Sequence, residues 1–436
     1  MVLSATENVA MKELLPGLNT LELPRMYRVR QRFDPTHIED VDEAVRAELS
    51  RPQINDILRG ARTVALAVGS RGIANIRDIV AATVAALRGQ DVDVFITPAM
   101  GSHGGATAEG QVDVLHHLGV TEASVGAPIR SSMNVVEIGA VTSSHGNRVP
   151  VCMDEIAYRE ADLVVPISRI KPHTGFKGSV ESGICKMITI GLGKHVGCAA
   201  LHREGMNVFD HLIPTAGKMV LETGRIGFSL AIVENGYEQT AMIEALTPAA
   251  SMKREGELLQ IAGERMARLL MERIDVLVVE RFGKNISGVG MDANVTGRGE
   301  LGGALPGYAG PDIKRIVVLG LTDKTYGNAH GIGLADVITD RVFEQINRGA
   351  TWTNTLTAGS LGCGRIPIGL PDERQAIMAA ASCVFGVKAT EAHIVRIWNT
   401  LCLTDIAVSQ SMVDAVGKTP GCEVIGEWNG TWSQSQ

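Results

Sequence analysis

The sequence predicts an α/β protein with two α/β domains, each built on a mainly parallel sheet. Short apolar runs rich in Val, Ile and Leu alternate with longer segments of helical period, which is typical of βα units. The chain has 49 glycines and only 4% aromatic residues, a composition that suits tight turns between strands and helices. Its 436 residues suffice for two or three domains with buried cores.

Six apolar runs are predicted to be strands because they are short and rich in Val, Ile and Leu. They span residues 63–69, 92–100, 161–170, 226–235, 274–282 and 315–321. Apolar residues at helical spacing predict a helix over 75–89 and a longer one over 251–273, where Ser251 is suited to N-capping. The longer helix is expected to close a first domain at residues 1–270, before a second domain at 275–436.

Composition and charge argue against several classes of protein. A formal net charge of −7 disfavours a general nucleic-acid binder, although a local basic pocket for a small anion is compatible with it. The seven cysteines are odd in number and form no CxxC pair, which disfavours a disulfide framework or a zinc knuckle. The N-terminus has no basic start followed by an apolar core, and no window approaches about 18 uncharged apolar residues. We therefore expect a cytoplasmic protein with a small-molecule substrate, no membrane segment and no nucleic-acid partner.

Polar residues come directly after three of the predicted strands. Ser70 and Arg71 follow the first run, and His103 follows the second in the glycine-rich turn GSHGG. His173 follows the third run. Because the carboxyl ends of parallel strands meet at one edge of a sheet, these side chains are expected at a common rim.

The glycines and lysines of the chain do not form a Walker A phosphate loop. With Gly193-Lys194 at its end, Ile188 stands where the first glycine belongs and His195 replaces the hydroxyl residue. The stretch GSRGIAN is a looser anion site, since its glycines let backbone N–H groups converge at a helix N-terminus and Arg71 can clamp a phosphate or carboxylate.

The segment from Lys171 to Gly205 is unusually rich in nitrogen donors. It holds three histidines and four lysines, and Glu181 is the only acid before His202. Its motifs "KPHTGF" and "SGICK", together with "GSHGG" and a histidine 16 residues after Lys186, resemble the lactate racemase family, which uses a nickel-pincer nucleotide. The resemblance covers most of the chain and implies an active site in the cleft between two α/β domains.

The resemblance also implies a cofactor and a set of site residues. In that family a pyridinium mononucleotide with two sulfur-containing arms is joined to a lysine as a thioamide, and nickel is held by a ring carbon, two sulfurs and a histidine. Carried over, the roles are cofactor attachment by Lys186, nickel ligation by His202, acid–base catalysis by His103 and His173, nucleotide binding by Gly69, Ser70 and Arg71, and substrate binding by Lys284 and Asn285.

The activity implied is that of an isomerase, a racemase or epimerase that inverts the hydroxyl-bearing α-carbon of a 2-hydroxy acid by hydride transfer. Two facing histidines suit it because imidazole can act as acid or base near neutral pH. No clear match to the family's substrate-binding glutamine is found, so a larger 2-hydroxy acid or a sugar acid is as good a candidate as lactate. Cofactor-biosynthesis proteins are expected partners, and the oligomeric state is left open.

Two other functions are compatible with the same residues. The first is a zinc or other metal hydrolase with His103, His173 and His202 as its three ligands, although the sequence lacks an HExxH-type helix. The second is a non-catalytic protein that binds or stores a nucleotide or nickel, which would need Lys186 and His202 but not both catalytic histidines.

Overall fold

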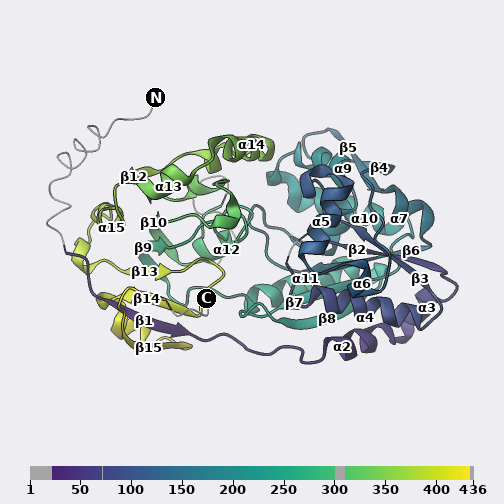
Figure 1. The fold of residues 1–436 in the computed structure, drawn as a ribbon, viewed down its shortest axis with the longest axis horizontal. Coiled ribbons are helices and arrows are strands. Elements are labelled where there is room, and N and C mark those ends of the chain that lie inside the picture. Colours follow the sequence, from purple (N-terminus) through teal and green to yellow (C-terminus); the bar gives the residue numbers. More distant parts are fainter. Residues whose placement is uncertain (1–21, 71, 300–309, 433–436) are drawn as a thin grey trace. The chain divides into compact units, whose positions relative to one another are not determined.

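The computed structural model describes residues 22–70, 72–299 and 310–432. The chain divides into two compact units (Figure 1). Asp34–Met266 form one, which we call the central unit, and Met1–Phe33 with Ala267–Gln436 form the other, the terminal unit. Each unit combines helices with a sheet whose strand pairs are mainly parallel, so the predicted α/β fold class is confirmed.

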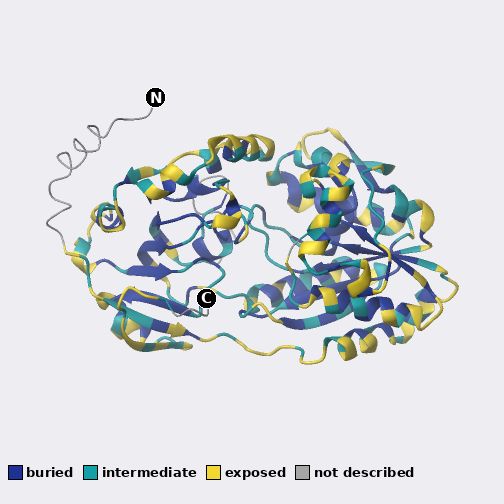
Figure 2. Cartoon of the chain, in the orientation of Figure 1, coloured by how far each residue is buried: buried dark blue, intermediate teal, exposed yellow. Residues whose placement is uncertain are grey.

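The central unit contains a five-stranded sheet with the strand order β3-β2-β6-β7-β8. Its strands are β2 (Thr63–Val68), β3 (Asp93–Pro98), β6 (Leu163–Arg169), β7 (Ser229–Glu234) and β8 (Thr240–Leu246). The first four strands of this order are parallel, and β8 pairs with β7 in the antiparallel direction. Apolar clusters cover both faces, which explains the near-continuous apolar runs in the sequence (Figure 2).

The two faces of β2 bury side chains of different size. On β2, Ala65 and Ala67 belong to one apolar cluster, whereas Val64 and Leu66 belong to the other. The alanine side is covered by α7 (Glu155–Glu160), α10 (Phe209–Glu222), α11 (Pro248–Arg265) and the hairpin β4 (Val135–Thr142) to β5 (Arg148–Asp154). The other side is covered by α2 (Val41–Leu49), α3 (Pro52–Leu58), α4 (Ile76–Arg88), α5 (Ala108–His117) and α6 (Glu122–Val125).

A sharply bent helical segment packs at the alanine side. It runs from α8 (Ile184–Lys186) through a π-helical turn, η2 (Met187–Gly191), into α9 (Lys194–His202), and the two halves meet at 110°. Lys194 adopts a left-handed conformation with φ of 51° at the bend. A Cβ on Gly191 would lie 2.7 Å from the carbonyl oxygen of Ala99, so the glycine lets this turn approach the end of β3.

The terminal unit is built on an eight-stranded mixed sheet in the order β12-β11-β10-β9-β13-β14-β1-β15. The strands are β1 (Met26–Gln31), β9 (Arg273–Val279), β10 (Asp312–Val318), β11 (Val337–Thr339), β12 (Ile368–Leu370), β13 (Ile394–Ile397), β14 (Asp405–Ser409) and β15 (Cys422–Glu427). Its longer helices are α13 (Asp340–Gln345), α14 (Arg348–Ala358) and α15 (Glu373–Ser382), and its one-turn helices are α12 (Ala293–Thr296) and α16 (Val413–Val416).

The predicted division of the chain differs from the observed one at the N-terminal end. The sequence places residues 1–270 in one domain, but β1 pairs with β14 and β15 and therefore belongs to the terminal unit. The amide of Gln31 fastens this strand, donating to the carbonyl of Leu403 at 2.7 Å and accepting from Leu270 N–H at 2.8 Å. These partners are more than 200 residues away in sequence, so no local pattern marks the pairing.

All six predicted strands are present, but the long helix begins and ends earlier in the sequence than predicted. Instead of 251–273 it spans 248–265, with Thr247 as N-cap and a proline at its first turn. Ser251 lies inside the helix, where its hydroxyl donates to the carbonyl oxygen of Thr247 at 3.0 Å. Met266 adopts an extended conformation, and the helix ends there at the boundary between the two units.

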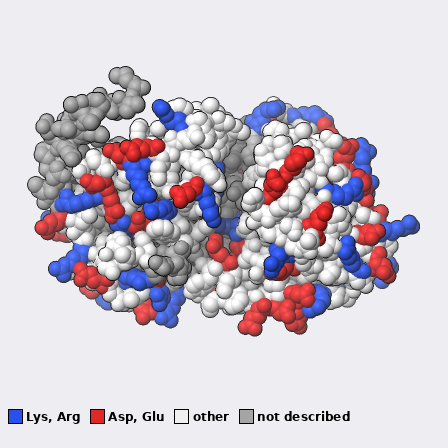
Figure 3. All heavy atoms as spheres, viewed as in Figure 1, with Lys and Arg blue, Asp and Glu red and all other residues white. Residues whose placement is uncertain are grey.

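Charges of both signs are mixed on the surface, and no single described helix suits a membrane span. Lys and Arg side chains are interspersed with Asp and Glu on the face seen in Figure 3. Among the described residues, no single helix is both long and apolar enough to cross a bilayer, and only the bent pair 184–191 and 194–202, taken together, meets the length and composition of a span.

Candidate functional site

The loops that carry the predicted site residues follow three adjacent parallel strands of the central unit. β3, β2 and β6 are neighbours in the sheet, so their carboxyl ends lie along one edge. Ser70 follows β2, His103 follows β3 and His173 follows β6, as the sequence predicts. Arg71 lies outside the described residues.

The His103 loop is held by two neighbours. Its exposed ring is hydrogen-bonded through Nδ1 to Ser70 Oγ at 2.5 Å, so the two predicted residues meet. The side-chain amide of Gln111 donates to the carbonyl oxygens of Gly101 at 2.8 Å and His103 at 3.3 Å. Gly104 has φ of 65°, and a Cβ there would lie 2.5 Å from the backbone of α5, so the tight turn requires glycine.

The His173 loop is organised by Glu181, the single acid of its segment. Backbone pairing of Lys171 with Ser182 closes the loop. Glu181 is buried, with 5% of its surface exposed. It accepts a hydrogen bond from the His173 backbone N–H at 2.5 Å and forms an ion pair with Lys177 at 3.2 Å. This carboxylate therefore acts as a structural anchor that positions His173.

Lys186 and His173 are in direct contact. Lys186 ends α8, and its Nζ lies 2.6 Å from His173 Nε2. The other ring nitrogen, Nδ1, accepts a hydrogen bond from the backbone N–H of Gly175 at 2.9 Å. The predicted attachment lysine and one predicted catalytic histidine thus form a pair.

His202 lies at the end of α9 with its ring orientation fixed by its own helix. Its Nδ1 is 2.8 Å from the carbonyl oxygen of Cys198, one turn earlier, and must donate to it. That tautomer leaves the lone pair on Nε2, the arrangement found when a histidine binds a metal through Nε2.

Two phenylalanines connect the histidines on one side of the site. The His202 ring lies 5.1 Å from Phe209, Phe209 lies 5.4 Å from Phe176, and Phe176 lies 4.5 Å from the ring of His173. Both phenylalanines are buried. Their rings thus connect the predicted nickel ligand to the predicted acid–base histidine through apolar contacts.

Some residues that shape this site were not identified from the sequence. Cys198 lies beside His202, and Ser102 Oγ is 3.8 Å from its sulfur, so α9 touches the His103 loop. The spacing of Cys198 and His202 by four residues, one helical turn, could have shown that they share a face. Phe176 and Phe209 carried no such signal, because apolar residues of this kind are common in any core.

Lys194 is a buried lysine whose role the sequence did not predict. It is fully buried, and its Nζ lies 2.5 Å from the carbonyl oxygen of Pro98, 3.0 Å from Asp154 and 3.2 Å from the side-chain oxygen of Gln111. Burial lowers the pKa of Lys194, and the charge of Asp154 opposes this shift. Since Gln111 also holds the His103 loop, one buried cation joins that loop to the start of the helix that carries His202.

Glu255 lies behind the Lys186 helix and is expected to make stability depend on pH. Its Oε2 accepts from Cys185 N–H at 3.0 Å, while its Oε1 is buried without a hydrogen-bond partner. Burial raises the pKa of Glu255 to about 7, although the bond from Cys185 opposes the rise. The folded state therefore holds a proton that the unfolded chain loses near pH 4, so this contribution to stability is complete below that pH and is lost as pH rises through about 7.

Glu255→Gln, which mimics the protonated acid, should stabilise the central unit by about 3 kcal/mol above pH 8, and this gain should shrink toward pH 5. Urea unfolding followed by circular dichroism at several pH values measures the difference. Glu264→Gln, at an exposed position of the same helix, is the matched control and should change little. Parallel stability curves for wild type and Glu255→Gln would show that Glu255 is ionised in the folded protein.

The two predicted substrate residues belong to the terminal unit. Lys284 Nζ donates to the carbonyl oxygen of Gly288 at 2.5 Å, and the side-chain oxygen of Asn285 accepts from the hydroxyl of Thr322 at 2.5 Å. Burial lowers the pKa of His330 to about 4, and the charge of Lys284 adds to this shift. The role of Lys284 and Asn285 toward a substrate stays a prediction.

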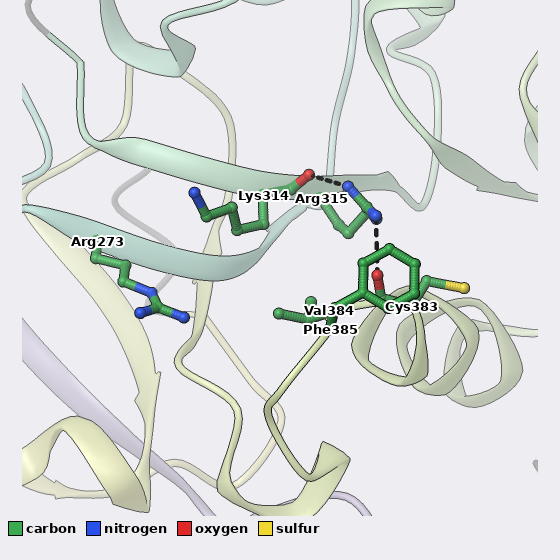
Figure 4. A pocket seen from close by; sticks show the side chains of 6 residues that line it. All are labelled: Arg273, Lys314, Arg315, Cys383, Val384 and Phe385. Carbon is green, nitrogen blue, oxygen red and sulfur yellow. Dashed lines mark hydrogen bonds between the residues drawn. The ribbon is translucent and has the colours of Figure 1, made fainter.

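The terminal unit also contains a pocket of about 220 Å³ that holds none of the predicted site residues (Figure 4). It is lined by Arg273, Lys314, Arg315, Cys383, Val384 and Phe385. Its cations are already engaged: Arg273 pairs with Asp275 at 3.0 Å, and Arg315 donates to the carbonyl oxygen of Cys383 at 2.8 Å. These two arginines are therefore bound to groups of the protein itself.

The hydrolase alternative is not supported by the arrangement of the histidines. Within the ranges that the structure describes, no three His, Cys, Asp or Glu side chains form a group that could hold a metal ion. His103, His173 and His202 are thus not brought together as three ligands of one ion.

Comparison with known proteins reveals similarity of fold rather than of sequence. No protein-family model matches the chain, and no curated protein matches it. A protein from Thermotoga maritima aligns with a TM-score of 0.48 at 14% identity, over 64% of this chain and 70% of its own. The lactate racemase apoprotein from Thermoanaerobacterium thermosaccharolyticum aligns with a TM-score of 0.53 at 15% identity, over 85% of this chain and 94% of its own. The chain therefore has a lactate racemase-like, two-domain α/β fold.

Proposed function

We propose that this protein is a racemase or epimerase that inverts the hydroxyl-bearing α-carbon of a 2-hydroxy acid with a nickel-pincer nucleotide attached to Lys186. The observation that carries the proposal is the direct contact of His173 with Lys186. Ser102 and Cys198 connect the His103 loop to His202, and Phe176 and Phe209 connect His202 to His173. The shared fold with a lactate racemase apoprotein supports it.

The residues present fit the proposed cofactor. His202 offers one Nε2 lone pair to a metal, because its Nδ1 is committed to the Cys198 carbonyl. Lys186 offers an amine for covalent attachment. Gly69 and Ser70 precede α4, whose N-terminus suits a phosphate group. When bound, the cofactor would accept the hydride of the α-carbon and return it to the opposite face.

The histidines then have complementary tasks. Ser70 orients the His103 ring through Nδ1, and we assign Nε2 of that ring to the hydroxyl proton of one enantiomer. His173 Nε2 is assigned to the proton of the other enantiomer, which it can accept as a base once the Gly175 N–H has released Nδ1 to hold the ring proton. Each ring acts as base in one direction and as acid in the other. Lys284 and Asn285 are proposed to bind the carboxylate and hydroxyl of the substrate.

The test follows deuterium on the α-carbon. Protein made together with the cofactor-biosynthesis proteins should gain mass on Lys186, and Lys186→Ala should not. The loaded protein should invert one of a series of α-deuterated 2-hydroxy acids, including lactate, larger acids and sugar acids, with the deuterium kept in the product. Loss of that deuterium to water would contradict hydride transfer. A mass gain without inversion of any member would instead support the non-catalytic binding protein.

A further inference from the structure

Two consecutive hydrogen bonds determine where the proton of the His173 ring lies. The backbone N–H of Gly175 donates to Nδ1 at 2.9 Å, and Nε2 lies 2.6 Å from Lys186 Nζ. A nitrogen that accepts a hydrogen bond carries no proton, and a neutral imidazole carries one proton on its two nitrogens. That proton is therefore on Nε2, and it faces the lysine.

The nitrogen of Lys186 must then accept the hydrogen bond from Nε2–H. An ammonium group has three donors and no lone pair, so only the neutral amine can accept. We propose that His173 holds Lys186 as a neutral, nucleophilic amine in the cofactor-free protein, primed to form an amide-type bond with an acyl or thioacyl carbon. The purpose of this priming rests on the proposed function, but the charge state of the lysine is independent of it.

The buried carboxylate of the His173 loop is engaged by other groups. The carboxylate of Glu181 is shared between Lys177, at 3.2 Å, and the backbone N–H of His173.

A neutral amine changes the first step of attachment. An ordinary lysine, with a pKa near 10.4, is a free amine in only about one molecule in 2,500 at pH 7. Lys186 would need only to release the hydrogen bond from His173. Its nitrogen then bonds to the acyl carbon, the bond from that carbon to its leaving group breaks, the leaving group departs with the electron pair, and the excess proton passes to water.

Nuclear magnetic resonance of the cofactor-free protein tests the charge state directly. With ¹³C at the ε-carbon of lysine, the signal of Lys186 is the one lost in Lys186→Arg. It should keep the chemical shift of a neutral amine from about pH 7 to pH 9. In His173→Ala the signal should move to the ammonium position and titrate near the ordinary lysine pKa of about 10.4. An ammonium signal for Lys186 in the wild type at pH 7 would overturn the inference.

Reactivity provides a second measurement. Acetylation by N-hydroxysuccinimidyl acetate, mapped by peptide mass, should be nearly independent of pH at Lys186 between pH 7 and 9. The exposed side chains of Lys218 and Lys253 in the same molecules serve as reference, and their rates should rise about tenfold per pH unit. His173→Ala should give Lys186 the same steep dependence.

The two measurements separate this inference from the proposed function. A steep pH dependence at wild-type Lys186, or an unchanged profile in His173→Ala, would remove His173 as the cause without bearing on racemisation. Conversely, a neutral Lys186 in a protein that inverts no 2-hydroxy acid would uphold the priming and reject the racemase.

Discussion

Lys194→Met should lower the free energy of unfolding of the central unit by about 3–5 kcal/mol, the usual cost of removing one partner of a buried ion pair. Both Lys194 and Asp154 have fully buried side chains, so the substitution leaves a carboxylate in the core without its counter-charge. It also removes the donor to the carbonyl of Pro98 and to Gln111. A loss of this size is a large share of the about 5–15 kcal/mol that stabilises a typical domain.

The chain allows the two units to be followed separately. Its four tryptophans, at positions 352, 398, 428 and 432, all belong to the terminal unit. Tryptophan fluorescence should therefore be unaffected by Lys194→Met. Circular dichroism and hydrogen exchange of central-unit peptides should instead report the lost stability. Lys218→Met, which breaks an exposed pair with Glu222, is the matched control and should cost under about 1 kcal/mol.

Asp154→Asn combined with Lys194→Met should recover part of the stability, because asparagine removes the uncompensated charge and keeps the cap that Asp154 provides to Ala157 N–H at 2.7 Å. Equal losses for Lys194→Met and Lys218→Met would mean that the lysine is not buried as an ion pair.

Replacement of His103 or His173 by alanine should slow the interconversion of enantiomers by about 100- to 10,000-fold, the range for loss of a general acid or base. Each ring is assigned to one face of the substrate, so neither direction is complete with a single ring. In a single turnover each variant should still consume one enantiomer, and the two variants should differ in which one.

The measurement is polarimetry or chiral chromatography with each pure enantiomer, normalised to the fraction of protein whose Lys186 carries the cofactor. This normalisation is essential for His173→Ala, because His173 contacts Lys186 and is expected to affect attachment. His211→Ala, at an exposed position of α10, is the control and should interconvert enantiomers at the wild-type rate. Undiminished interconversion by either catalytic variant would reject the assignment of two acid–base histidines.

Much of the central unit could be predicted from local sequence alone. The runs at residues 63–69, 92–100 and 161–170 have the apolar continuity of strands buried on both faces, and the structure contains β2, β3 and β6 there. Because parallel strands align their carboxyl ends, the sequence also placed Ser70, His103 and His173 at one edge of the sheet. The four-residue spacing of Cys198 and His202 was likewise available from helical period.

Only the tertiary structure decided the interactions between residues distant in sequence. Nothing around Lys194 distinguishes it from a solvated lysine; its burial depends on Asp154 and Gln111, 40 and 83 positions earlier, which folding brings within about 3 Å. The pairing of β1 with β14 could likewise not be predicted from the local sequence. Strand partners are selected by burial and register rather than by neighbouring residues. The proposed charge state of Lys186 could not be predicted from the sequence either. It depends on which nitrogen of His173 accepts the Gly175 N–H, and composition and spacing do not encode that geometry.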